Sequence, residues 1–422
     1  MSVHFVIPTR RSLISTLALA CVSIGSAHAT NGYFQHGYGV QSLGMAGAGI
    51  ALPLDALAGA TNPAGTALLA DRLDIGLTYF SPTRGASVQG NSYGLDGNSS
   101  GSGKRAFLIP EIGYVRHLDA QTTLGLSVYG NGGMNTQYDT NPFASLGGQG
   151  QAGVNLEQLF ISPSLAFKIT PTQSVGIAAN IAYQRFSAQG LQPFTSASAD
   201  PQHVTNQGTD TSTGAGVRLG WNGELVPGWR AGATWSSQIS GRFNKYKGLF
   251  ADQGSFDIPA NYGMGLSYQP TSVWALTADY QVIQYSQVKA VANPLRQLFA
   301  GIPLGGNDGP GFGWKDVSVI KIGGQYAWNS DLTLRAGYSH ATQPVPRDQT
   351  FINILAPGLV QDHVTAGFTW KASSTSEWSA YYAHAFNKVV KGQNSIPASF
   401  GGGEANIHLK ETSLGLAYGW RF

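Results

Sequence analysis

The chain has 422 residues, of which 56 are glycine and only 11% are charged, against roughly 25% charged residues in an ordinary soluble protein. After the first 30 residues, no stretch approaches the roughly 20 consecutive apolar residues of a transmembrane helix. Low charge, many glycines and aromatics, and no spanning helix are typical of a transmembrane β-barrel, in which apolar and polar residues alternate.

Residues 1–29 have the features of a secretory signal peptide. Arg10 and Arg11 supply the basic part, residues 13–24 are mostly apolar, and Ala27-His28-Ala29 forms an A-x-A cleavage site. We therefore expect the mature chain to begin at Thr30.

Cys21 is the only cysteine and lies inside the expected signal. A lipoprotein signal acylated at Cys21 is the alternative, but residues 18–20 match that signal poorly. The mature chain then has no thiol, which excludes disulfides and thiolate metal sites. Removing Arg10 and Arg11 leaves 23 of the 25 Lys and Arg against 22 Asp and Glu, a net charge of +1. This balance gives no reason to expect a nucleic-acid partner.

Residues 30–71 form a segment rich in small residues. Residues 42–49 read S-L-G-M-A-G-A-G, and the triplet Asn62-Pro63-Ala64 follows Asp55. Small residues let backbones approach closely, and Asn-Pro favours a turn. The segment is too apolar for an exposed tail and too irregular for a strand. We interpret it as a compact plug, with a poorly ordered linker as the alternative.

Period-two alternation predicts fourteen strands after residue 71. An even number suits an antiparallel transmembrane β-barrel made of one bacterial chain, so we expect a barrel over residues 72–422. The strands are expected at roughly 72–81, 110–118, 122–130, 158–169, 174–186, 211–226, 229–243, 255–268, 273–288, 317–328, 332–341, 362–371, 376–387 and 409–422.

The connections between these strands alternate in length. An up-and-down barrel with both ends in the periplasm has short periplasmic turns and longer outer loops. Six connections are short, around Asp119, Pro171, Pro227, Pro270, Asn329 and Ser374, and seven are long, at 82–109, 131–157, 187–210, 244–254, 289–316, 342–361 and 388–408. The loops 289–316 and 342–361 are apolar and need covering. They are expected to pack together as a lid, to form a ligand-binding site, or both.

The last strand illustrates the two faces of the predicted barrel. Leu414, Leu416, Tyr418, Trp420 and Phe422 share one face, which suits outer-membrane lipid. The residues between them are small or polar and suit the lumen. A final Phe after an alternating strand resembles the C-terminal signal of bacterial outer-membrane proteins, which the barrel-assembly machinery would bind.

The sequence contains no H-E-x-x-H, no P-loop and no strand-linked G-x-G-x-x-G. Residues 97–101 match G-x-S-x-G, but they lie in a low-complexity loop without the strand–turn–helix that the motif needs. Ser339 and His340 adjoin, but neighbouring strand residues point to opposite faces. We expect no enzyme, no cofactor and no metal.

Three sets of residues together resemble a known family. They are S-L-G-M-A-G-A-G, D-A and N-P-A in the segment 30–71; Y-G-N-G-G-M-N-T at 129–136; and G-W-K-D at 313–316 with R-A-G-Y at 335–338 and P-V-P at 344–346. Over essentially its whole mature length, the chain resembles the FadL/TodX (OmpP1) family, whose members carry long-chain fatty acids or aromatic hydrocarbons across the bacterial outer membrane.

The resemblance implies a fourteen-stranded barrel filled by an N-terminal hatch and a passive mechanism. A hydrophobic ligand binds among the outer loops, passes to a pocket in the barrel, and leaves sideways where the third strand kinks inward. Glycine in a strand marks bends and weak pairing, and a plain strand-to-loop transition is the alternative. The implied hatch residues are Gly44, Gly47, Gly49, Asn62, Pro63 and Ala64, and the implied kink residues are Gly130, Asn131, Gly132 and Gly133.

One departure from the family bears on the ligand. The basic residues that hold the carboxylate in fatty-acid members fall near Gly190 and Pro310 here, and neither is basic. Arg185 and Lys315 lie close by and are candidates for polar contacts with the ligand. Arg185, however, is expected on the same face of its strand as apolar residues. An uncharged hydrocarbon is therefore more plausible as the ligand of this chain than as the ligand of a typical member of the family. A general diffusion porin and a structural or adhesive surface barrel remain as alternatives.

Overall fold

The computed structural model describes residues 31–422, so the expected signal peptide lies outside the described residues. The strands are β1 (Arg72–Gln89), β2 (Gly97–Ser100), β3 (Phe107–His117), β4 (Thr122–Asn135), β5 (Gly153–Thr170), β6 (Gln173–Gln189), β7 (Asp210–Val226), β8 (Trp229–Ser236), β9 (Asn261–Tyr268), β10 (Trp274–Ile283), β11 (Val317–Ala327), β12 (Leu332–Ala341), β13 (Asp362–Lys371), β14 (Ser376–Val390) and β15 (Glu404–Arg421).

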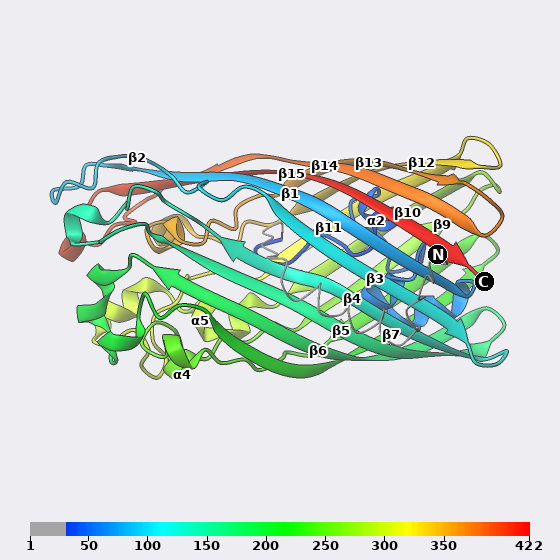
Figure 1. Cartoon of the computed structure of the whole chain (residues 1–422), viewed down its shortest axis with the longest axis horizontal. Helices are drawn as coiled ribbons and strands as arrows, with labels where there is room; N and C mark the ends of the chain where they lie inside the picture. The colour runs from blue at the N-terminus through cyan, green and yellow to red at the C-terminus, as the bar shows by residue number, and fades with distance from the viewer. Residues whose placement is uncertain (1–30) are drawn as a thin grey trace, which may run out of the picture.

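These strands form one antiparallel sheet that closes on itself. Each strand pairs with its neighbours in chain order, except that β2 pairs only with the far end of β1, and β1 also pairs with β15 and β3. The result is a closed barrel of fourteen strands with one extra strand, β2 (Figure 1). The predicted number of barrel strands is confirmed, because every expected strand has a counterpart.

The strand boundaries differ most from the prediction in two regions, and β4, β5, β14 and β15 also extend into the expected loops 131–157 and 388–408. Residues 82–109 were expected to be a loop, but β1 continues to Gln89 and β2 pairs with it. The expected strands 229–243, 255–268 and 273–288 are too long. Beyond β8 the wall continues only as isolated bridges, Ile239 with Ile258 and Arg242 with Ser255. Apolar and polar residues still alternate in this stretch, although the regular backbone pairing between the strands has ended.

All six predicted short turns lie at one end of the barrel and the seven long loops at the other, the loop end (Figure 1). Only short helices occur in the loops. These are η2 (Ala144–Leu146), η3 (Gln192–Ala197), η4 (Pro201–His203), η5 (Asn244–Tyr246), α4 (Ala251–Gly254), η6 (Tyr285–Gln287), α5 (Lys289–Ala292), η7 (Leu295–Ala300), η8 (Arg347–Gln349), η9 (Ile352–Ile354) and η10 (Ala398–Phe400). Within residues 31–422, no helix has the length and apolar character needed to cross a membrane.

The outward and inward faces follow the predicted alternation. In β15, Leu414, Leu416 and Trp420 are exposed, whereas Ser413 and Ala417 are buried. Aromatic pairs stand opposite each other near the turn end, which is where interfacial aromatics anchor a membrane protein. These cross-strand pairs are Trp229–Tyr268, Trp274–Tyr326 and Trp378–Tyr418, with ring centroids 4.3, 4.6 and 4.9 Å apart.

Residues 31–71, the N-terminal segment, are almost entirely buried and fold into α2 (Val40–Leu43), α3 (Ala58–Thr61) and η1 (Pro63–Leu68). The segment hydrogen-bonds to inward-facing groups around the barrel. Asp279 of β10 accepts from the N–H groups of Gly49 and Ile50 at 2.7 and 3.0 Å. Glu111 of β3 accepts from those of Gly39 and Val40 at 3.1 and 3.0 Å.

Glycines on the inner face of the barrel leave room for this segment. A Cβ at any of them would meet the backbone or side chains of residues 44–64, so a larger residue would force the segment away. They are Gly113 (β3), Gly176 (β6), Gly220 (β7), Gly232 (β8), Gly265 (β9), Gly323 (β11), Gly337 (β12) and Gly367 (β13).

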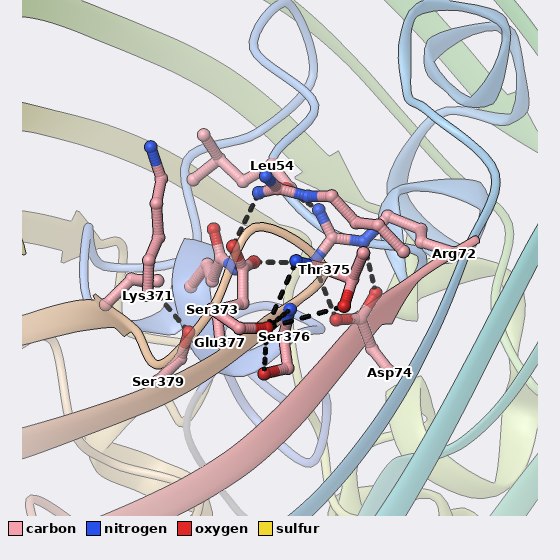
Figure 2. A network of polar contacts seen from close by, with 12 residues as sticks. Leu54, Arg72, Asp74, Lys371, Ser373, Thr375, Ser376, Glu377 and Ser379 are labelled. Atoms are coloured by element: carbon pink, nitrogen blue, oxygen red, sulfur yellow. Dashed lines mark hydrogen bonds and ion pairs between the residues drawn. The ribbon is translucent and has the colours of Figure 1, made fainter. Parts of the chain in front are cut away.

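A buried charge network anchors the segment near the turn end (Figure 2). Arg72 of β1 lies between Asp74 and Glu377, with an N–O distance of 2.7 Å to each carboxylate. The same arginine donates to the Leu54 carbonyl at 3.3 Å, and Glu377 accepts from the Gln41 amide at 2.8 Å. The network joins β1, β14 and two points of the N-terminal segment.

Candidate functional site

An apolar cavity lies between the strands β5 and β6 and the loops at the loop end. Its lining contains no charged side chain and consists of Val154, Phe186, Leu249, Phe250, Ala290, Leu295, Leu304, Pro310, Gly311, Phe312, Ile352 and Leu355. About 30 Å³ of this cavity is open, room for about one water molecule. Its apolar walls suit a hydrocarbon group, but side chains must move before one can enter.

The two apolar loops both pack together and line this cavity. The indole N–H of Trp314 donates to Asn353 Oδ1 at 2.6 Å, and the Asn353 amide donates to the Phe312 carbonyl at 2.7 Å. Leu295 and Ile352, one from each loop, line the cavity. The loops 289–316 and 342–361 therefore pack against each other and form part of the cavity wall.

A second hollow, the outer groove, opens at the surface of the loop end and has a volume of about 460 Å³. Phe299, half exposed, and Phe400 face it, with ring centroids 6.5 Å apart. The Phe400 ring also lies 5.5 Å from that of buried Phe351. Ser196, Ser198 and Ser399 also line the groove, so it combines aromatic rings, which favour contact with a hydrophobic ligand, with polar groups.

Aromatic rings connect the cavity with the wall at β4. The ring centroids of Phe250 and Phe256 lie 4.8 Å apart, those of Phe256 and Tyr33 6.1 Å, and those of Tyr33 and Phe34 5.6 Å. Phe34 then forms a backbone bridge with Gly132 of β4. Apolar surface is thus continuous from the cavity to this strand.

The pairing between β3 and β4 is interrupted along part of the barrel wall. It extends only from His117–Thr123 to Ile112–Val128. Closer to the loop end, a parallel bridge between Ser102 and Gln137 joins the segment before β3 to the segment after β4. We call the unpaired stretch between these two points the β3–β4 window. Pro110 of β3 borders it, a residue type suited to a strand edge that lacks a partner.

At the window, β4 departs from its regular path. Its register with β5 shifts between Gly130 and Gly132, so Asn131 is an extra, bulged residue. Residues 129–134 are all buried, whereas the preceding part of β4 alternates. The N-terminal segment bonds to this part of β4, because Gln35 N–H donates to the Asn131 carbonyl at 3.0 Å and Gly133 N–H to the Tyr33 carbonyl at 2.9 Å.

The two candidate basic residues do not line the apolar cavity. Arg185 is one-third exposed and pairs with Glu157 at 3.3 Å, and Lys315 is exposed. Pro310, at a position where the resemblance led us to look for a base, lines the cavity itself. Arg84, a buried inward-facing residue of β1 that reaches the window, was not predicted from the sequence. No local pattern indicated its position, because residues 82–109 were expected to form a loop.

Most of the expected hatch residues make close contacts within the N-terminal segment or with the barrel wall. Asn62 caps η1, accepting from Ala64 N–H at 3.2 Å and donating to the carbonyls of Ile50 and Trp221, both at 2.9 Å. Pro63 opens η1, where a missing N–H costs nothing. Gly47 has φ of 75° and lies against His36, so a side chain there would clash. Gly44 approaches Gly367 of β13, and Gly49 donates to Asp279.

Ser339 is buried on the lumen face and His340 is exposed on the other face. Within residues 31–422, no three His, Cys, Asp or Glu side chains are grouped to hold a metal ion.

The fold and site define a class: a bacterial outer-membrane barrel whose interior and loops offer apolar surface. Comparison with known proteins then identifies the family. Residues 21–422 match the family model described as "Outer membrane protein transport protein (OMPP1/FadL/TodX)", and the chain belongs to that family.

Individual relatives are distant in sequence but cover nearly the whole chain. A "Long-chain fatty acid transport protein" of Escherichia coli is 24% identical, covering 92% of this chain and 94% of the relative. The solved structure of a Pseudomonas aeruginosa FadL homologue is 17% identical with a TM-score of 0.70, covering 93% of this chain and all of the other. That of the P. putida toluene transporter TodX is also 17% identical, with a TM-score of 0.67 and coverages of 92% and 99%. These structures share the fold.

Proposed function

We propose that this protein carries hydrophobic compounds passively across the outer membrane and releases them sideways through the β3–β4 window. The observation that carries the proposal is the loss of β3–β4 pairing beside the bulge at Asn131. An apolar ligand gains free energy by moving from an apolar site into lipid rather than into water. Passage through the wall therefore suits such a ligand better than passage through a wet channel.

The path begins at the outer groove, continues through the apolar cavity, and follows the aromatic rings to the window. Residues 30–71 act as a plug in this proposal, and residues 72–422 form the barrel around it. Support for the plug comes from the hydrogen bonds that tie it to β1, β3, β4, β6, β7 and β10 to β14.

The ligand belongs to the class of long-chain fatty acids or of aromatic and aliphatic hydrocarbons. The names of the relatives support this class, because one is called a long-chain fatty acid transport protein and another a toluene transporter. The apolar lining of the cavity suits the hydrocarbon part that both have in common. The final strand, β15, together with Phe422 is proposed to bind the barrel-assembly machinery.

Uptake in a deletion strain tests the proposal. The strain would carry wild-type protein or an empty vector and receive labelled oleate or toluene. We expect the wild type to restore uptake of at least one ligand, while the purified protein conducts ions weakly in planar bilayers. Strong conductance would indicate a general diffusion porin. Uptake that does not depend on the protein would indicate a structural or adhesive barrel.

A further inference from the structure

Arg84 spans the β3–β4 window from inside the barrel. It lies on the lumen face of β1 and is only 2% exposed. Its guanidinium donates to the carbonyl of Lys104, just before β3, at 2.9 Å and to Asn135 Oδ1 at the end of β4. One side chain thus braces the two strands that do not pair with each other here.

The positive charge of Arg84 has no contacting counter-ion. Its acceptors are two backbone carbonyls, of Pro82 and Lys104, and the Asn135 amide, which are all neutral. Among residues 31–422, no carboxylate oxygen lies within 4 Å of it, and its Nε donates no hydrogen bond. A buried charge that lacks an opposite charge is costly. By contrast, the charge of Arg72 on the same strand is balanced by two contacting carboxylates.

Glu411 of β15 is the acidic residue that faces the Arg84 region. Arg84 is in register with Leu409, so Glu411 is a diagonal neighbour, at about 7–8 Å for such positions. Both of its carboxylate oxygens are buried and accept no hydrogen bond within the described part of the chain. Glu411 therefore offsets part of the Arg84 charge from a distance, but neither of its oxygens contacts the guanidinium, whose Nε keeps a free donor for a ligand.

Beside this cation lies an apolar surface. Phe80, Phe107 and Ile109 form a buried cluster on β1 and β3. The Arg84 guanidinium carbon lies 6.0 Å from the centre of the Phe107 ring, and the Lys104 ammonium 4.9 Å from it. A cation next to an apolar cluster matches a ligand with an anionic head and a hydrocarbon body. The cavity, with its uncharged lining, has no means to select such a head.

We propose that Arg84 is the specificity-determining residue of the window, where its guanidinium binds the carboxylate of a hydrophobic acid in place of Asn135. A guanidinium binds a carboxylate through two parallel hydrogen bonds that are stronger than those to a neutral amide. Binding of the acid would also release the brace across the window. This inference rests on the proposed transport function and narrows its ligand class to hydrophobic monocarboxylic acids.

A matched pair of ligands tests the proposal: oleate and oleyl alcohol, which share one hydrocarbon chain. Binding to the full-length protein would be measured in a neutral detergent for wild type, Arg84→Met and Arg84→Lys. Loss of a charged hydrogen-bonded contact should weaken oleate binding about tenfold or more in Arg84→Met, with a smaller loss in Arg84→Lys. Oleyl alcohol binding should change less than about twofold, because its neutral head forms only ordinary hydrogen bonds.

Two controls separate the window from other arginines. Arg105→Gln removes an exposed charge from the same stretch. Arg218→Met removes an equally buried arginine, 3% exposed, that lies on β7 against Thr61. Neither should alter the ratio of oleate to oleyl alcohol affinity. Folding of each variant would be checked by the mobility shift of the unheated barrel on a denaturing gel, and Arg84→Gln would replace Arg84→Met if that variant does not fold.

An equal loss for both ligands, or no loss for either, would overturn the assignment of Arg84. In those cases the wild type still binds the ligands and restores their uptake, so the proposed transport function stands. If the wild type binds neither ligand and restores uptake of neither, the transport function and this inference both fail.

Discussion

The backbone carbonyl of Tyr33 accepts a 2.9 Å hydrogen bond from the N–H of Gly133, so the N-terminal segment bonds to β4 where β3 does not. The segment thereby satisfies backbone groups that an interrupted sheet would leave without partners. It also holds the inward course of β4. The stability of the segment and the geometry of the window are therefore coupled.

Gly132→Ala should weaken this coupling. A methyl group at Gly132 would clash with the Tyr33 carbonyl, and overpacking typically costs about 1–3 kcal/mol. We expect a lower free energy of unfolding, measured by guanidinium titration in lipid vesicles. Gly49→Ala is the control, because its Cβ would find only an ordinary contact of 3.6 Å with Ser42. Equal stability of the two variants would argue against a tight contact at Gly132.

Arg72→Met should destabilise the protein strongly. The Arg72 and Glu377 side chains are each only 4% exposed, and removal of one partner from a buried pair costs about 3–5 kcal/mol. Arg116→Met breaks a 3.0 Å pair with Asp71 whose arginine is 49% exposed, and should cost less than about 1 kcal/mol. The same titration compares them. A similar loss in both variants would refute the anchoring role of Arg72.

Asn62→Ala should loosen the N-terminal segment and raise ion conductance. The substitution removes the hydrogen bonds to Ile50, Trp221 and Ala64, each worth about 1 kcal/mol. Single-channel recording in planar bilayers would measure the change. Asn91→Ala is the matched control, because Asn91 makes similar bonds to Phe400, Gly402 and Tyr93 in the outer loops. If Asn62→Ala conducts no more than Asn91→Ala, the segment is not the barrier.

Asp55 should make stability depend on pH. It lies in the N-terminal segment, outside the strands, and burial, followed by the neighbouring Asp74, raises the pKa of Asp55 to about 7. Between its ordinary pKa of about 3.9 and 7, the folded protein keeps a proton that the unfolded chain has released. Stability therefore falls as pH rises through this range and levels off above it.

Asp55→Asn should remove this part of the slope. The measurement compares the free energy of unfolding of the two proteins at pH 5 and pH 8. If both lose the same stability between these values, Asp55 does not titrate in the folded protein as we expect.

The barrel was predictable because, along each strand, residues suited to lipid alternate with residues suited to the lumen. Leu414 and Ser413 differ in burial as their parity requires, and the same holds wherever one face meets lipid. β2 was missed because its residues, Gly97–Ser100, have no apolar face. Its pairing comes from the extension of β1 and not from its own sequence.

The site was predictable only in part, because it depends on where distant segments meet. The glycines around Asn131 indicated a bend, but the register shift follows from how β4 bonds to β5. Arg84 gave no local sign of its role, since that role requires Lys104 and Asn135 on two separated strands. Arg185 was considered because of its position in the chain, and its partner turned out to be Glu157.

Deletion of Asn131 tests the central claim most directly. Asn131 is the extra residue opposite β5, so its removal should let β4 run straight and pair with β3. The deletion variant and the wild type would be compared for binding of labelled oleate by purified protein and for uptake in the deletion strain. We predict that the purified variant still binds oleate, because Asn131 lines neither the outer groove nor the cavity, and that uptake falls to the level of the empty vector. Uptake equal to that of the wild type, from a folded variant, would contradict lateral release through the β3–β4 window.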